Sequence, residues 1–139
     1  MILIVYANVI ISALIKEDKT RGLLIDCPFT LYCPETLISS IRKYEEIIIK
    51  KSMLSKEEFE ILFSLITEKI SVVEKDKYVL NMEKAEEIIG SFDKDDAPYI
   101  ALALSLTNDG VWSDDFHFKK QNLIKIFTTT EIINYTLGI

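Results

Sequence analysis

The stretch that decides the fold is residues 91–106, SFDKDDAPYIALALSL. It places three acidic residues, Asp93, Asp95 and Asp96, directly before a run of small apolar residues that is typical of a buried helix. One carboxylate at a helix N-terminus is favourable, because it faces free backbone N–H groups and the positive end of the helix dipole. Three neighbouring carboxylates repel one another unless a cation lies between them. The stretch therefore predicts both a central helix and an acidic site at its start.

A second acidic pair, Asp114 and Asp115, follows one short strand after this helix. Around the two acidic groups, strands rich in β-branched residues alternate with amphipathic helices, and no tight hairpin joins two strands. The predicted strands cover residues 2–5, 29–33, 70–73, 111–113 and 123–127. The predicted helices are one capped by Asn8, then 20–26, 35–50 opened by Pro34, 56–68, 77–89 stopped by Gly90, 96–107, a short stretch over 114–121, and a Thr-capped C-terminal helix. This alternation predicts an α/β fold, a three-layer α/β/α arrangement with a mainly parallel central sheet.

Ligand sites in folds of this kind lie beyond the C-terminal ends of the strands. Tyr6 and Asn8 follow the strand over 2–5, and residues 113–115 follow the strand over 111–113. We therefore expect these two strand ends to share one crevice with the start of the Asp96 helix.

The chain has 139 residues, a length that favours a single domain over residues 1–139. Its net charge of -6 offers no overall basic surface for nucleic acid. That charge does not exclude a metal-dependent nuclease, because such enzymes concentrate acids at the active site.

The cysteine and histidine content indicates the cellular compartment and whether a zinc site is expected. Two cysteines, Cys27 and Cys33, and one histidine, His117, are too few for a zinc site of the usual kind. Both cysteines are expected to be reduced, as in a cytoplasmic protein. No apolar run reaches the length of a membrane span, and the N-terminus lacks the features of a signal peptide.

Four segments of the chain resemble the PIN-domain family, and within it the archaeal and bacterial toxins of the VapC type. They are MILIVYANVIISAL (1–14), CPETLISSIRKYEEII (33–48), DDAPYIALAL (95–104) and VWSDDFHF (111–118). The resemblance implies a small α/β/α domain, often a homodimer, that cleaves RNA with Mg²⁺ or Mn²⁺. Toxin members of the family are paired with an inhibitory antitoxin protein.

The family pattern has acids at four places, and this chain keeps two of them. Asp96 and Asp115 match, which implies that they are the catalytic residues and metal ligands. Tyr6 and Ser40 stand where the other two acids are expected, and His117 replaces a further, more peripheral acid. One or two carboxylates with substrate phosphates can still hold one Mg²⁺, so a weak metal site is expected and a two-metal site is not.

The neighbouring residues have more than one interpretation. Tyr6 either fills the space of a metal ion or stacks on a base. Asn8 is either a helix cap or a contact to phosphate or water, and Ser113 either holds a neighbouring acid or ends its strand. His117 is either a surface residue or a substitute for a water-orienting acid. These alternatives make Asn8, Ser113 and His117 candidate substrate-binding residues.

The remaining acids and bases have simpler expected roles. Asp93 and Asp95 are expected to be solvated loop charges, and Asp95 is also a capping candidate. Asp114 and Asp115 are candidate caps for the short stretch that follows them. Glu35 is one turn or more from Ser40, so it is not expected to replace the missing acid. The basic residues Arg42, Lys43, Lys50 and Lys51 are interpreted as a solvated helix face, with a weak RNA-binding patch as the alternative.

Two functions follow from this pattern. The first is a metal-dependent ribonuclease weakened by Tyr6 and Ser40. The second is a non-catalytic PIN-fold module that binds RNA, an antitoxin-like protein or a second copy of itself.

Overall fold

The computed structural model describes residues 1–89 and 94–139. Across these residues, five strands form one sheet in the order β3-β2-β1-β4-β5. Every strand pair is parallel. The strands are β1 Ile2–Val5, β2 Thr30–Pro34, β3 Ile70–Val73, β4 Gly110–Trp112 and β5 Ile126–Phe127. The predicted parallel sheet is therefore confirmed.

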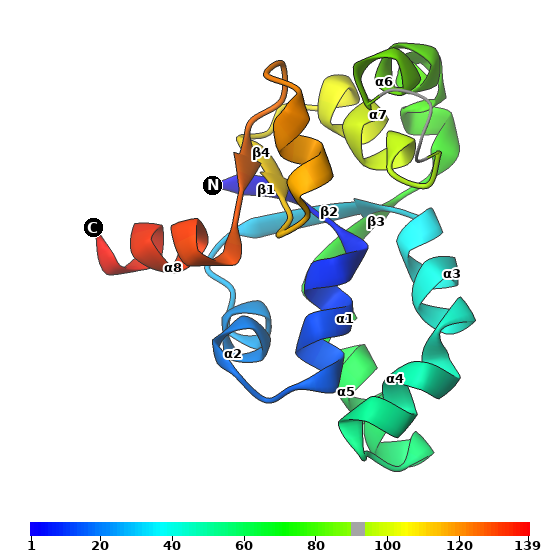
Figure 1. The fold of residues 1–139 in the computed structure, drawn as a ribbon, viewed down its shortest axis with the longest axis vertical. Helices are drawn as coiled ribbons and strands as arrows, with labels where there is room; N and C mark the ends of the chain where they lie inside the picture. The colour runs from blue at the N-terminus through cyan, green and yellow to red at the C-terminus, as the bar shows by residue number, and fades with distance from the viewer. Residues whose placement is uncertain (90–93) are drawn as a thin grey trace.

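Helices cover both faces of this sheet. They are α1 Ala7–Ile15, α2 Lys19–Ile25, α3 Thr36–Lys43, α4 Glu45–Ser52, α5 Lys56–Thr67, α6 Met82–Ile89, α7 Ala97–Ser105 and α8 Thr129–Leu137, with 3₁₀ turns η1 Lys75–Lys77, η2 Val79–Asn81 and η3 Phe116–Lys120. Figure 1 shows α6 and α7 on one side of the sheet and α1, α2 and α5 on the other. This is the three-layer α/β/α arrangement that the sequence predicts.

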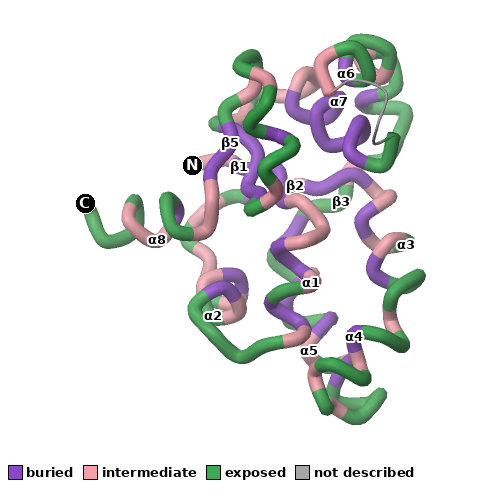
Figure 2. The backbone as a smooth tube through the Cα atoms, in the orientation of Figure 1, coloured by how far each residue is buried: buried purple, intermediate pink, exposed green. Residues whose placement is uncertain are grey.

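The core lies between the sheet and these two helical layers. In β1, residues 3–5 are fully buried, as expected for a central strand covered on both faces. Helix α7 is buried from Ala97 to Ala103, which explains its small side chains. Figure 2 shows the buried backbone concentrated in the central strands and α7, whereas the end of α8 is exposed. Among the described residues, no helix combines the length and apolarity needed to cross a bilayer.

The strands β4 and β5 approach each other closely at Gly110. This residue has φ +149°, and a Cβ atom built on it would lie 2.5 Å from the carbonyl oxygen of Lys125. Only glycine fits such a contact without a backbone shift. On the same strand, the fully buried Trp112 donates its indole N–H to Thr129 Oγ1 at 3.0 Å.

Several predicted boundaries are wrong, each for a local reason. Pro34 ends β2 instead of opening a helix, because it pairs with Val73 of β3 and the next amide, of Glu35, bonds the Val73 carbonyl. The helix predicted over 35–50 is interrupted at Tyr44, whose backbone is not helical. The helix predicted over 77–89 begins only at Met82, after two 3₁₀ turns. The strand predicted over 123–127 is limited to β5, because the side chain of Gln121 binds the backbone of residues 123 and 124. Gly90, the predicted helix stop, lies outside the described residues.

Candidate functional site

The C-terminal ends of β1 and β4 meet the start of α7 at one edge of the sheet (Figure 1). The amide of Tyr6, directly after β1, donates to the carbonyl of Trp112 at 3.0 Å. Ser113 follows Trp112, and Asp96 is the residue immediately before α7. Residues separated by about 90 positions in the sequence are therefore neighbours at this edge.

Asp96, Asp115 and His117 come together here. Each offers one ligand atom, a carboxylate oxygen or a ring nitrogen, and these atoms all lie within 4.8 Å of one another. Asp96 is 1% exposed, and the side chains of Asp115 and His117 are more open. Two carboxylates and an imidazole within this distance are a donor set that can hold a divalent cation.

Asp115 is held in place by the turn in which it lies. Its amide donates to Ser113 Oγ at 3.0 Å, and its Oδ1 accepts from the amide of His117 at 3.0 Å. The same oxygen lies 3.3 Å from His117 Nδ1. Ser113 thus holds the neighbouring acid through its amide, and Asp115 is the N-cap of η3.

Tyr6 covers the other carboxylate. Its hydroxyl donates a hydrogen bond to Asp96 Oδ1 at 2.5 Å. Its ring makes edge-on contacts with Tyr99 and with Phe118, with ring centroids 4.8 Å and 4.7 Å apart. This packing favours the interpretation in which Tyr6 fills the site over the one in which its ring stacks on a base.

The phenol of Tyr6 keeps its proton and therefore donates its hydrogen bond at neutral pH. Burial raises its pKa far above the ordinary value of a phenol, and the hydrogen bond to Asp96 and the negative charge of Asp96 raise the pKa further. Burial likewise raises the pKa of Tyr99. Neither phenol can therefore replace the missing carboxylate as an anionic ligand.

Ser40, the second position at which an acid is expected, lies in the same region as Tyr6. Both line a hollow of about 210 Å³. The lining residues are Tyr6, Ala7, Asn8, Ile11, Ser40, Tyr44, Asp95 and Tyr99. The two neutral replacements therefore adjoin one space, which holds less negative charge than the family pattern implies.

The prediction that Asn8 caps a helix is wrong. Helix α1 begins at Ala7, and the residue in the N-cap position is Tyr6, whose extended backbone still pairs with β4. Asn8 therefore lies inside the first turn. Its buried Oδ1 has no hydrogen-bond partner among the described residues, and Asn8 lines the hollow beside Tyr6.

Two of the aspartates predicted as helix caps, Asp114 and Asp95, do not cap the predicted helices. Asp114 does not cap the stretch that follows it. Its two carboxylate oxygens accept from the amide and the hydroxyl of Thr129, at 2.8 Å and 2.7 Å. Asp95 is not the N-cap of α7 either, because that position is Asp96, which makes no side-chain capping bond. Asp93 lies outside the described residues.

The side chains of Glu35 and Arg42 bind partners outside the Asp96 group. Glu35 Oε1 accepts from the hydroxyl of Tyr78 at 3.1 Å, and Glu35 is not part of the Asp96 group. The Arg42 guanidinium binds Glu45 and both carboxylate oxygens of Glu60. Arg42 is therefore tied up in ion pairs, which weighs against the interpretation of this helix face as an RNA-binding patch.

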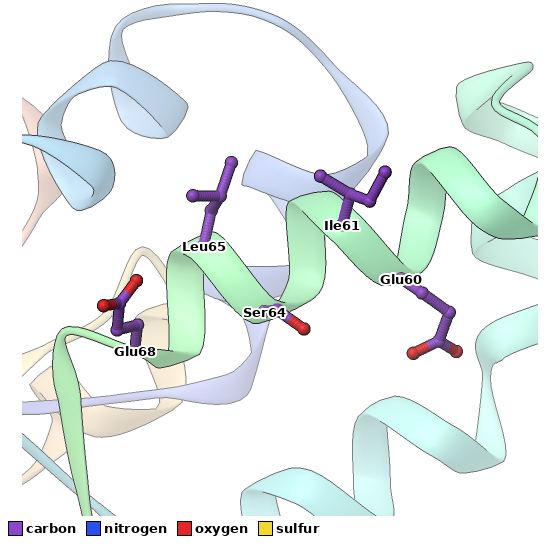
Figure 3. A pocket seen from close by; sticks show the side chains of 5 residues that line it. All are labelled: Glu60, Ile61, Ser64, Leu65 and Glu68. Atoms are coloured by element: carbon purple, nitrogen blue, oxygen red, sulfur yellow. The ribbon is translucent and has the colours of Figure 1, made fainter.

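A second hollow lies along α5, far from these acids in the fold. It is lined by Glu60, Ile61, Ser64, Leu65 and Glu68, and Figure 3 shows Ile61 and Leu65 pointing to the same side of the helix. Two aliphatic side chains, Ile61 and Leu65, alternate here with polar ones, and Glu60 is paired with Arg42. It offers no group of residues suited to catalysis.

The PIN-domain family model matches residues 4–137. This chain belongs to the PIN-domain family. PIN domains are typically metal-dependent nucleases, and the acidic group lies where the fold brings strand ends and the start of α7 together. A search of curated proteins finds no match.

The donor set of this PIN domain fits a single divalent ion. Two carboxylates supply the oxygen ligands that Mg²⁺ and Mn²⁺ prefer, and the imidazole suits Mn²⁺ and other transition metals better than Mg²⁺. Among the described residues, the group contains no third carboxylate. The donor set of Asp96, Asp115 and His117 thus fits a single metal ion.

Proposed function

We propose that this PIN domain is a divalent-cation-dependent ribonuclease resembling VapC-type toxins, with activity weakened by its altered site. The proposal depends on one observation, the convergence of Asp96, Asp115 and His117 within 4.8 Å. In the proposed site Asp96 and Asp115 hold one Mn²⁺ or Mg²⁺. Held by these two residues, the ion would supply Lewis acidity toward the scissile phosphate.

The chain's own residues have distinct roles in this proposal. Asp115, fixed by Ser113, orients the attacking water, and the half-exposed His117 contacts the phosphate or that water. Asn8 lines the adjoining hollow and is a further candidate contact for the RNA backbone. Weak activity is expected, because neutral Tyr6 and Ser40 leave the ion with fewer anionic ligands.

The test is cleavage of a panel of RNA substrates in Mn²⁺. Cleavage by the wild type that is abolished by EDTA and by Asp96→Asn or Asp115→Asn supports the proposal. Asp114→Asn is the matched control, since Asp114 is adjacent to Asp115 but binds Thr129. A wild type that cleaves nothing, together with a Tyr6→Asp/Ser40→Glu variant that does cleave, overturns the proposal.

The alternative is a non-catalytic module, and the Tyr6–Asp96 hydrogen bond favours it, because this bond occupies one oxygen of a carboxylate that the proposed nuclease uses. Such a module would bind RNA, an antitoxin-like protein or a second copy of the chain. Exposed apolar residues on α4 and α5, among them Ile47, Ile61 and Leu65, support a protein partner. Micromolar Mn²⁺ binding that depends on Asp96 and Asp115 would count against this alternative.

A further inference from the structure

The hollow beside Tyr6 is lined by two residues that each carry a buried, unsatisfied polar atom. Asn8 Oδ1 and the Tyr99 hydroxyl both lack a hydrogen-bond partner among the described residues, and both residues line this hollow of about 210 Å³. Tyr99 is only 2% exposed. Most buried polar groups in proteins are satisfied, because a buried group without a partner costs free energy. Two such atoms beside one space therefore point to a ligand that supplies their partners.

The two atoms need different partners. Asn8 Oδ1 is an acceptor and needs a donor. The Tyr99 hydroxyl keeps its proton, because burial raises its pKa, and it therefore needs an acceptor. The backbone N–H of Ala7, which lowers that pKa in part, is itself a donor and cannot take the proton. A ligand that satisfies both atoms must carry a hydrogen-bond donor and an acceptor.

The lining of the hollow disfavours a phosphate and favours a flat neutral group. Of the eight described residues that line it, none is basic and Asp95 alone carries a charge, so an anion would be repelled. Three of the eight are tyrosines, and Tyr44 is 44% exposed, so its ring is accessible for stacking. Pockets for drug-sized ligands have volumes of roughly 300 Å³ or more, so this smaller hollow suits one ring system.

We propose that the hollow binds a single unpaired nucleobase, whose edge donates to Asn8 Oδ1 and accepts from the Tyr99 hydroxyl. The bases of RNA carry donors and acceptors on their exposed edges, which proteins read in unpaired strands. The base comes from an RNA strand or from a free nucleotide. For an RNA strand the inference rests on the proposed function and deepens it, because Tyr6 joins the hollow to Asp96. It gives Asn8 a base edge as its contact in place of the RNA backbone.

The experiment is a ligand-observed nuclear magnetic resonance titration of the full chain in EDTA, so that base binding is measured without metal-dependent cleavage. The probes are the four nucleoside 5′-monophosphates, and ribose 5-phosphate is the control ligand because it lacks the base. At least one monophosphate should bind with a Kd on the order of 1 mM or tighter, and ribose 5-phosphate should not bind. Failure of all four monophosphates to bind, or equal binding of ribose 5-phosphate, overturns the inference.

Two variants test whether the base lies in this hollow. Tyr99→Phe removes one hydroxyl and keeps the ring that packs against Tyr6, and Asn8→Ala removes the acceptor. Each should weaken binding of the monophosphate roughly five- to tenfold, which is the factor that one hydrogen bond of ordinary net strength provides. Tyr135→Phe is the control, because Tyr135 packs edge-on against Phe29 and does not line the hollow, and it should bind like the wild type.

A second readout separates a ligand contact from a structural role of Tyr99. Because its hydroxyl has no partner in the free protein, Tyr99→Phe should leave the free energy of unfolding unchanged or raise it while it weakens base binding. Wild-type affinity for the monophosphate in either Tyr99→Phe or Asn8→Ala overturns the inference. Folding is checked by circular dichroism, and where one variant does not fold, the other decides.

The source of the base is decided with an RNA trinucleotide that carries the base of the bound monophosphate. Tighter binding of the trinucleotide than of the monophosphate supports an RNA strand, whereas equal binding overturns RNA as the source in favour of a free nucleotide. Failure of this inference is distinguishable from failure of the proposed function. Base binding in EDTA without RNA cleavage in Mn²⁺ would reject the nuclease and leave the base site intact, and RNA cleavage without base binding would do the reverse.

Discussion

Asp114 accepts two hydrogen bonds from Thr129, one from its amide at 2.8 Å and one from its hydroxyl at 2.7 Å. This pair connects the loop after β4 to the start of α8. Its neighbour Asp115 faces Asp96 and His117 instead. Two adjacent aspartates therefore have separate tasks, one in stability and one in the proposed site.

The first prediction follows from this division. Asp114→Ala should lower the free energy of unfolding by about 1 kcal/mol, because it leaves an amide in the first turn of α8 without its partner. Urea unfolding followed by circular dichroism measures the change. Mn²⁺ binding should stay at the wild-type level, and a large loss of Mn²⁺ affinity in Asp114→Ala would contradict the separation of tasks.

The second prediction contrasts two glycines. Gly110→Ala should destabilise the protein by about 2 kcal/mol or more, because its positive φ is strained for alanine and the new Cβ would overlap the Lys125 carbonyl. Gly22→Ala, in the exposed part of α2 with nothing within 4 Å of the added Cβ, should stabilise it by about 0.5–1 kcal/mol. Thermal unfolding of both variants provides the comparison. Similar melting temperatures of the two variants would contradict the close approach of Gly110 in β4 to the Lys125 carbonyl.

The third prediction concerns alkaline pH. Burial, with a contribution from the nearby charge of Glu35, raises the pKa of Cys33 to about 12 from an ordinary 9.0. The folded state therefore holds a proton that the unfolded state releases, so the stabilisation is complete below pH 9 and is lost as pH rises toward 12. The raised pKa values of Tyr6 and Tyr99 act in the same direction above pH 10.

Urea unfolding at pH 8 and pH 10 measures this effect. Stability should fall between the two pH values, and Cys33→Val should show a smaller fall because it has no thiol to titrate. An equal fall in both proteins would assign the whole effect to the tyrosines.

The fourth prediction concerns the choice of metal. His117 supplies a nitrogen donor at a position where the family pattern has an acid, and nitrogen donors favour Mn²⁺ over Mg²⁺. His117→Asp should therefore raise Mg²⁺ affinity relative to Mn²⁺ affinity. Competition between the two ions in calorimetry measures the ratio, and an unchanged ratio would remove His117 from the set of ligands.

Patterns within short segments predicted most of the fold. The apolar strand of residues 2–5 and the small-residue helix after Asp96 have clear periodicities, and their order implied a parallel sheet. The rule that sites lie at strand ends then brought Asp96 and the residues after β4 to one edge. Local periodicity and strand order are enough to place these residues, so this edge of the sheet is predictable from the sequence.

Long-range contacts decided what the sequence left open. The hydrogen bond from Tyr6 to Asp96 joins residues 90 positions apart, and the Asp114–Thr129 pair has no local signature. The preference of proline for the first turn of a helix predicts a helix at Pro34, whereas its pairing with β3 has no signal in the local sequence. Asn8 is a good capping residue by type, but strand pairing extends to Tyr6 and sets the helix start two residues earlier than a cap at Asn8 would.

The environment of Trp112 has a practical consequence. It is the one tryptophan of the chain, it is wholly buried, and its indole shares Thr129 Oγ1 with Asp114. Its intrinsic fluorescence should be blue-shifted in the native state and shift to the red when the sheet is exposed to water. The protein thus carries its own optical reporter, one hydrogen-bonded neighbour away from the loop that holds Asp115.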